Sequence, residues 1–116
     1  GDLSFIYDQN GLWNNHIPNN LKLFVFNNQG GGIFKIISGP KNTPFLEEYF
    51  ETKHELSLKS IAQTHHLNYH CAKNEKEAGQ IIPSVLESNQ FEIVEFFTGN
   101  VENEKILNDY FSVIKK

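Results

Sequence analysis

The sequence is notable first for what it has little of. It contains no methionine and a single cysteine, Cys71, so no internal disulfide can form and a reducing cytoplasmic setting is expected. Its 10 lysines and arginines are outnumbered by 14 acidic residues, which excludes the basic footprint of a nucleic-acid-binding protein. No apolar run approaches the ~20 residues that span a bilayer. The five histidines lack a His-Glu-x-x-His pattern, so a zinc site is not indicated.

The chain begins with Gly1-Asp2-Leu3-Ser4, without an initiating methionine or a basic leader. We therefore expect no signal peptide, and we expect the chain to be an excised piece of a longer protein whose upstream domains are absent. Its 116 residues suffice for one small domain with a modest core. The apolar share of 39% and the charged share of 21% are those of an ordinary globular protein.

Hydrophobic periodicity predicts an alternation of helices and strands along the chain. The predicted strands are apolar runs, at residues 21–26, 67–71 and 90–98, and the predicted helices have apolar residues at three- and four-residue steps, at residues 4–16, 58–66, 75–87 and 102–114. Residues 33–37 are expected to form a short helix or an irregular segment that covers a pocket, and residues 44–50 one or two helical turns. The apolar residues of the last helix are expected to face the core. This alternation favours an α/β fold, a three-layer sandwich with a mainly parallel sheet that is incomplete at its N-terminus.

Two short polar runs flank the first helix and strand. One contains Asp2, and the other is Asn27-Asn28-Gln29-Gly30-Gly31-Gly32. A turn, helix, strand, turn unit can bring both runs to one edge of a parallel sheet, where a carboxylate, an amide oxygen and a flexible glycine backbone would converge. Oxygen ligands of this kind suit a magnesium ion that carries a phosphorylated cofactor. Taken singly, the same residues are also typical of ordinary turns, caps and flexible loops.

The order of residues in both runs resembles that of a known family. Gly-Asp at one end and Asn-Asn after an apolar strand resemble the thiamine diphosphate signature. Closer agreement lies in Gly1-Asp2-Leu3-Ser4-Phe5, Tyr7-Asp8, Asn10-Gly11-Leu12 and Asn27-Asn28-Gln29-Gly30-Gly31-Gly32-Ile33-Phe34. These runs resemble the menaquinone-pathway synthases that make succinyl-enolpyruvyl-hydroxycyclohexene-carboxylate (SEPHCHC synthases). The resemblance implies a thiamine diphosphate-binding fold, with residues 1–116 as the C-terminal part of the domain that binds the cofactor diphosphate and magnesium.

The resemblance also implies a site and a reaction. Asp2 and Asn28 would ligate Mg²⁺ (or Mn²⁺) through their side chains, and Gly30 would do so through its carbonyl. The diphosphate would be held by Leu3 and Ser4 together with the glycine run Gly30, Gly31 and Gly32, while Ile33 and Phe34 would line the substrate pocket. The implied substrates are 2-oxoglutarate, which is decarboxylated, and isochorismate, which receives the succinyl unit.

One part that the family requires is missing. The cofactor ring in such enzymes is activated by a glutamate on a separate pyrimidine-binding domain, normally across a subunit interface, and that domain lies upstream. We therefore expect no catalytic residue within residues 1–116 and no activity from the isolated chain. The full-length parent is expected to be a cytoplasmic transferase, a homodimer or homotetramer without a membrane span.

A second interpretation assigns the chain to a different class of function. The same alternation of strands and helices is found in non-catalytic flavodoxin-like or receiver-like interaction domains, in which Asp2 would be an ordinary turn residue. A receiver domain needs a cluster of acids and a lysine at its strand ends. Asp2, Asp8 and Glu95 do not form such a set on the predicted strands, and no predicted strand ends in a lysine.

Overall fold

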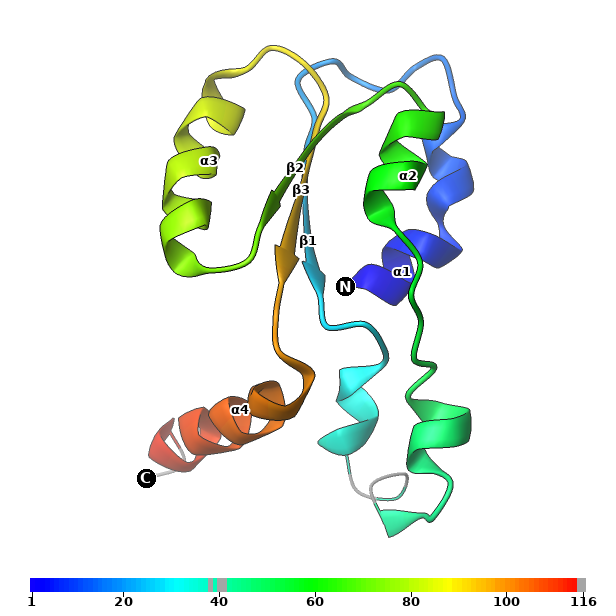
Figure 1. Cartoon of the computed structure of the whole chain (residues 1–116), viewed down its shortest axis with the longest axis vertical. Coiled ribbons are helices and arrows are strands. Elements are labelled where there is room, and N and C mark those ends of the chain that lie inside the picture. The colour runs from blue at the N-terminus through cyan, green and yellow to red at the C-terminus, as the bar shows by residue number, and fades with distance from the viewer. Residues whose placement is uncertain (38, 40–41, 115–116) are drawn as a thin grey trace. The chain divides into compact units, whose positions relative to one another are not determined.

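The computed structural model describes residues 1–37, 39 and 42–114, and the chain divides into two compact units (Figure 1). Unit 1 comprises Gly1–Asn27 and Leu56–Phe97, and unit 2 comprises Asn28–Glu55 and Thr98–Lys116. The structure determines the inside of each unit but not the position of one unit relative to the other. Within the described ranges, no helix combines the length and the apolar character that a membrane crossing requires.

Unit 1 is built on a parallel sheet of three strands. The strands β1 (Lys22–Asn27), β2 (Asn68–Ala72) and β3 (Glu92–Phe97) are arranged in the order β1-β3-β2, and both pairings are parallel. The last strand in the sequence therefore lies in the centre of the sheet. Its residues from Glu92 to Glu95 are all buried, as expected for a strand covered on both faces.

Helices cover both faces of this sheet, which confirms the predicted three-layer α/β arrangement. Figure 1 shows α3 (Glu75–Glu87) on one side of the strands, and α1 (Asp2–Tyr7) and α2 (Leu58–Thr64) on the other. The main core lies on the α1 and α2 side and is formed by buried apolar side chains, namely Phe5, Ile6, Val25, Leu58, Ala62, Phe91 and Ile93. Figure 1 also shows that the strands run in one direction, so their carboxyl ends lie at one edge of the sheet.

Side-chain caps explain where two of the predicted helices begin. The Ser57 hydroxyl accepts a hydrogen bond from the Ser60 amide at 3.2 Å, which starts α2. The Asn74 side chain accepts one from the Glu77 amide at 2.9 Å, which starts α3. Such caps satisfy amide groups that have no partner inside the helix. Pro83 has no amide N–H, and it was expected to kink or split the helix predicted over 75–87, but α3 is not split and continues through it from Glu75 to Glu87.

The first predicted helix is longer than the observed one. Instead of continuing to residue 16, α1 ends at Tyr7 and is followed by a 3₁₀ turn, η1 (Gln9–Leu12). Asn10 and Gly11 are poor helix formers, so the apolar spacing beyond them does not sustain an α-helix. Trp13, beyond this turn, is 85% exposed and takes no part in the core.

Unit 2 contains short helical segments and one long helix. Its elements are the 3₁₀ turn η2 (Gly32–Lys35), the π-helical turn η4 (Leu46–Phe50) and α4 (Asn100–Ile114). The short turns confirm the two brief helical predictions. The apolar residues of α4 were expected to face a core, but Ile106 is 62% exposed and Val113 is 72% exposed. Helical periodicity therefore identified the helix but not a surface that would cover it.

A buried ion pair joins the segments of unit 2. The Glu51 carboxylate, with no exposed side-chain surface, lies 2.7 Å from the Lys35 ammonium and 3.6 Å from that of Lys53. Phe34 in η2 and Phe50 in η4 pack with ring centroids 5.7 Å apart. Because a buried charge is costly unless it is paired, this ion pair fixes how η2 and the end of η4 lie against each other.

Candidate functional site

The carboxyl end of β1 is where unit 1 places Asp2. A Cβ added to Gly1 would lie 3.8 Å from the Phe26 carbonyl oxygen, so α1 begins beside the end of β1. Asp2 is the first residue of α1 and is 1% exposed. The predicted carboxylate is thus buried next to the point at which the chain leaves β1 through Asn27 and enters Asn28.

A polar group of three side chains crosses the sheet from this end of β1, through β3, to β2. Glu95, 2% exposed in the central strand, accepts a hydrogen bond from the Asn27 side-chain amide at 2.5 Å. Its other carboxylate oxygen accepts a hydrogen bond from the Tyr69 hydroxyl of β2. Burial, reinforced by the hydrogen bond to Glu95, raises the pKa of Tyr69 above its ordinary value, so its hydroxyl remains a donor at neutral pH.

The backbone of the glycine run in unit 2 lies so close to its neighbours that side chains at Gly30 and Gly32 would collide with them. A Cβ on Gly30 would lie 2.9 Å from the Glu51 carbonyl oxygen, and the Gly31 amide donates to the same oxygen at 2.5 Å. A Cβ on Gly32 would collide with the side-chain nitrogen of Asn28. Glycine at Gly32 therefore leaves the space in which the Asn28 amide lies.

The two residues predicted to line a substrate pocket follow directly on this run. Ile33 is 62% exposed. Phe34 is half-buried against Phe50. The pair thus presents apolar surface at the start of unit 2, and its place in a substrate pocket stays a prediction.

The two residues predicted to hold the diphosphate lie in the first turn of α1. Leu3 is half-buried and Ser4 is exposed. The helix N-cap is Gly1, which brings no side chain to the first-turn amides. Ser4 also borders a cavity of about 360 Å³ between α1 and β1. The start of α1 thus offers backbone N–H groups, the donors that an anion requires.

The structure groups the predicted residues by unit. Asp2, Leu3 and Ser4 belong to unit 1, and Asn28, Gly30, Gly31, Gly32, Ile33 and Phe34 belong to unit 2. The peptide bond between Asn27 and Asn28 joins the two sets. Binding of one ion by Asp2 and Asn28 together stays a prediction.

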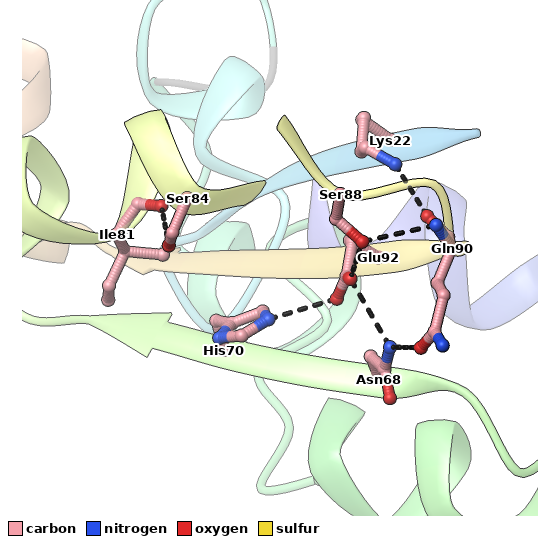
Figure 2. A network of polar contacts seen from close by, with 8 residues as sticks. All are labelled: Lys22, Asn68, His70, Ile81, Ser84, Ser88, Gln90 and Glu92. Carbon is pink, nitrogen blue, oxygen red and sulfur yellow. Dashed lines mark hydrogen bonds and ion pairs between the residues drawn. The ribbon is translucent and has the colours of Figure 1, made fainter. Parts of the chain in front are cut away.

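A second polar network lies at the opposite, amino end of the strands (Figure 2). Glu92, 5% exposed, accepts hydrogen bonds from Ser88 at 2.5 Å and from Asn68 at 3.2 Å, and it pairs with His70 at 2.9 Å. Burial alone would raise the pKa of Glu92, but hydrogen bonds from Ser88, His70 and Asn68 outweigh it and hold that pKa below its usual value. This network stabilises the sheet and lies at the other end of the strands from Asp2.

The predicted ligands are oxygen atoms, which suit magnesium better than a metal ion whose ligands all come from protein side chains. Among residues 1–37, 39 and 42–114, no group of three or more histidine, cysteine or acidic side chains could hold a metal ion. Magnesium does not need such a group, because it commonly takes one or two protein oxygens and completes its shell with phosphates and water. Asp2 in unit 1, and Asn28 and the glycine backbone in unit 2, offer oxygen atoms of the type that magnesium prefers. Binding of magnesium and a diphosphate by these residues stays a prediction.

Sequence reasoning missed two buried acids that shape this region, Glu95 and Glu51. Each lies in or beside an apolar segment, and a charged residue in an apolar strand such as residues 91–97 is a signal of a paired, buried carboxylate. That signal identifies the burial but not the partner. The Asn27 partner of Glu95 lies 68 residues earlier in the chain.

Comparison with known proteins identifies relatives along the whole chain. No family model matches it. A 2-succinyl-5-enolpyruvyl-6-hydroxy-3-cyclohexene-1-carboxylate synthase of Christiangramia forsetii is 42% identical over 116 residues, which cover 99% of this chain and 20% of the relative. Synthases of the same name from Cytophaga hutchinsonii and Flavobacterium psychrophilum are each 40% identical, over 100% and 96% of this chain and 21% and 20% of their own lengths.

The similarity is thus complete for this chain and partial for its relatives. The chain spans about one fifth of the length of the curated relatives that it matches. The matched region includes the Gly-Asp and Asn-Asn runs, since it covers 99% of the chain in the Christiangramia protein. This chain therefore belongs, as a segment, to the family of 2-succinyl-5-enolpyruvyl-6-hydroxy-3-cyclohexene-1-carboxylate synthases.

Proposed function

We propose that residues 1–116 form the C-terminal part of the thiamine diphosphate- and magnesium-binding domain of a SEPHCHC synthase. The observation that carries this proposal is the burial of Asp2 at the start of α1, beside the end of the strand that leads into Asn27 and Asn28. A buried carboxylate at the carboxyl end of a parallel strand is where an α/β sheet binds its ligands. The similarity to synthases over the full chain supports the same assignment.

Each predicted residue then has a defined task. The Asp2 carboxylate, the Asn28 side-chain oxygen and the Gly30 carbonyl hold Mg²⁺ or Mn²⁺. The backbone amides of Leu3 and Ser4 bind diphosphate oxygens, and Gly31 and Gly32 let the loop approach them closely. Ile33 and Phe34 exclude water from the substrate. The chain thereby anchors and orients the cofactor instead of supplying an acid or base.

The proposed reaction uses 2-oxoglutarate and isochorismate. The chemistry supplied by bound thiamine diphosphate is an electron sink for loss of carbon dioxide from 2-oxoglutarate and transfer of the succinyl unit to isochorismate. The glutamate that activates the cofactor lies on another domain of the full-length protein, and a homodimer or homotetramer brings it to this site. We expect this assembly in the cytoplasm, and we expect the isolated chain to have no synthase activity.

Calorimetric titration of Mg²⁺ into the full-length protein with thiamine diphosphate tests the proposal. Asp2→Asn and Asn28→Ala should each weaken Mg²⁺ binding by more than the roughly 10–100-fold that a hydrogen-bonding neighbour of a ligand contributes. Asp8→Asn is the matched control, because Asp8 is exposed at the other end of α1. Asp8→Asn should bind like the wild type.

The same titration distinguishes the second class of function. Wild-type affinity in both Asp2→Asn and Asn28→Ala would refute the site and favour a non-catalytic flavodoxin-like or receiver-like interaction domain. Loss of binding in those two variants alone would support the synthase.

A further inference from the structure

The buried Glu95 carboxylate lies in the central strand, on the face of the sheet that also carries Val25 and Asn27. In the parallel register Val25 pairs with Glu95, and side chains two residues apart on a strand share a face. The carboxylate accepts one hydrogen bond on each oxygen, from Asn27 on one and from Tyr69 on the other. None of the roles proposed for Asp2, Asn28 or the glycine run uses Glu95.

The contact with Glu95 sets the orientation of the Asn27 side chain. The Asn27 side-chain nitrogen donates to Glu95, so the side-chain oxygen of Asn27 faces away from the carboxyl group. Asn27 is the last residue of β1, and its carbonyl carbon is bonded to the Asn28 nitrogen. The contact with Glu95 therefore acts on the residue that directly precedes the proposed ligand Asn28.

We infer that Glu95 is a positioning residue for the magnesium site: through its hydrogen bond to Asn27 it holds the Asn27–Asn28 peptide in the orientation that Mg²⁺ binding requires. This inference rests on the proposed function. Glu95 does not touch the ion or the cofactor in this role. It acts as a fixed acceptor, and hydrogen-bonding neighbours of metal ligands commonly contribute about 10–100-fold in metal affinity.

Methionine and glutamine at this position separate the effect of the hydrogen bond from that of packing. Glu95→Met has a similar length but no oxygen, so it cannot accept from Asn27. Glu95→Gln keeps one acceptor, and because the Tyr69 hydroxyl can accept as well as donate, the glutamine can accept from Asn27 and donate to Tyr69.

The experiment is calorimetric titration of Mg²⁺ into the full-length protein with thiamine diphosphate. Glu95→Met should weaken Mg²⁺ binding about 10-fold or more, and Glu95→Gln, which keeps an acceptor for Asn27, should recover most of that loss. Glu92→Met is the matched control, because Glu92 is a buried, hydrogen-bonded glutamate of the same strand at its opposite end. Its Mg²⁺ affinity should stay within about twofold of the wild type.

Several outcomes would overturn the inference. Wild-type Mg²⁺ affinity in Glu95→Met would do so, and so would equal losses in Glu95→Met and Glu92→Met, because they would indicate general destabilisation. If Glu95→Met does not fold, Glu95→Asp applies the same test, since it keeps the carboxylate but shortens the reach to Asn27. Absence of Mg²⁺ binding in the wild type would overturn the proposed function as well, whereas loss of binding in Asp2→Asn with normal binding in Glu95→Met would overturn the positioning role alone.

Discussion

Replacement by alanine should affect stability differently at two glycines of the same loop, Gly30 and Gly32. Gly30→Ala places a methyl group 2.9 Å from the Glu51 backbone carbonyl. Gly32→Ala places one against the end of the Asn28 side chain. Among the described glycines, only Gly39 has a positive φ, so neither Gly30 nor Gly32 is strained by alanine through its backbone angles. The difference between the two variants is therefore purely one of space.

The magnitudes follow from what each methyl group meets. The Glu51 carbonyl already accepts the Gly31 amide at 2.5 Å, so the backbone has little freedom to retreat, and Gly30→Ala should cost about 1–3 kcal/mol of stability, as overpacking does. The Asn28 amide can rotate away at a cost of roughly 0.5–1.5 kcal/mol. Alanine returns about 0.4–1 kcal/mol by restricting the unfolded chain, so Gly32→Ala should be nearly neutral.

Gly32→Ala should lower the affinity for Mg²⁺ although it hardly changes the stability of the protein. Moving the Asn28 amide from its place removes a proposed ligand, so Mg²⁺ binding with thiamine diphosphate should fall about 10–100-fold while the protein remains folded. Stability is measured by denaturant or thermal unfolding of the full-length protein, and affinity is measured by calorimetry. A loss of affinity without a loss of stability is the signature of a displaced ligand.

The control is a glycine at which an added methyl group would contact no other atom. A Cβ on Gly79, inside α3, would have no neighbour within 4 Å, and Gly79→Ala should stabilise the helix by roughly 0.5–1 kcal/mol without changing Mg²⁺ affinity. The reasoning is refuted if Gly32→Ala binds Mg²⁺ as tightly as the wild type. It is also refuted if Gly30→Ala is as stable as Gly32→Ala.

Three further predictions follow from the described contacts. Lys35→Met removes the nearer of the two ammonium groups that pair with the buried Glu51 carboxylate, so it should lower stability by about 3 kcal/mol; a Lys35→Met/Glu51→Met double variant that is no more stable than Lys35→Met would contradict this account. Because the pKa of Glu92 is lower in the folded state, Glu92 adds to the free energy of unfolding at pH values above its ordinary pKa of 4.5, and this stabilisation is lost as the pH falls through the folded pKa. Glu92→Gln should therefore make the free energy of unfolding fall less steeply at acid pH, and an unchanged fall would contradict this prediction. The isolated 116-residue chain should release no carbon dioxide from 2-oxoglutarate above a blank, and turnover by the chain alone would place a catalytic group within it.

Local patterns predicted the elements of this protein well because each pattern repeats within a few residues. The predicted helix over 75–87 coincides with α3, and the strand over 21–26 is shifted by one residue relative to β1. The first helix was predicted too long, because apolar spacing continues past Gly11 while helix propensity does not. The apolar side of α4 was predicted to be buried, but burial depends on a covering surface that periodicity does not describe.

The site divides in the same way. Asp2, Asn28 and the glycine run were identified from residue types and spacing, and the structure shows that Asp2 is buried and that Gly32 leaves space for the Asn28 amide. Glu95 could not be assigned a partner from the sequence. Its contact with Asn27 depends on the strand order β1-β3-β2.

The sequence by itself determined the order of helices and strands, the two polar runs and the family, because these depend on residues close together in the chain. Tertiary structure alone decided which acids are buried and what holds them. β3 comes last in the sequence but pairs with both earlier strands, which brings Glu95 beside Asn27 and Tyr69. A carboxylate inside a sheet persists only where donors from neighbouring strands meet it, and strand order decides which donors those are.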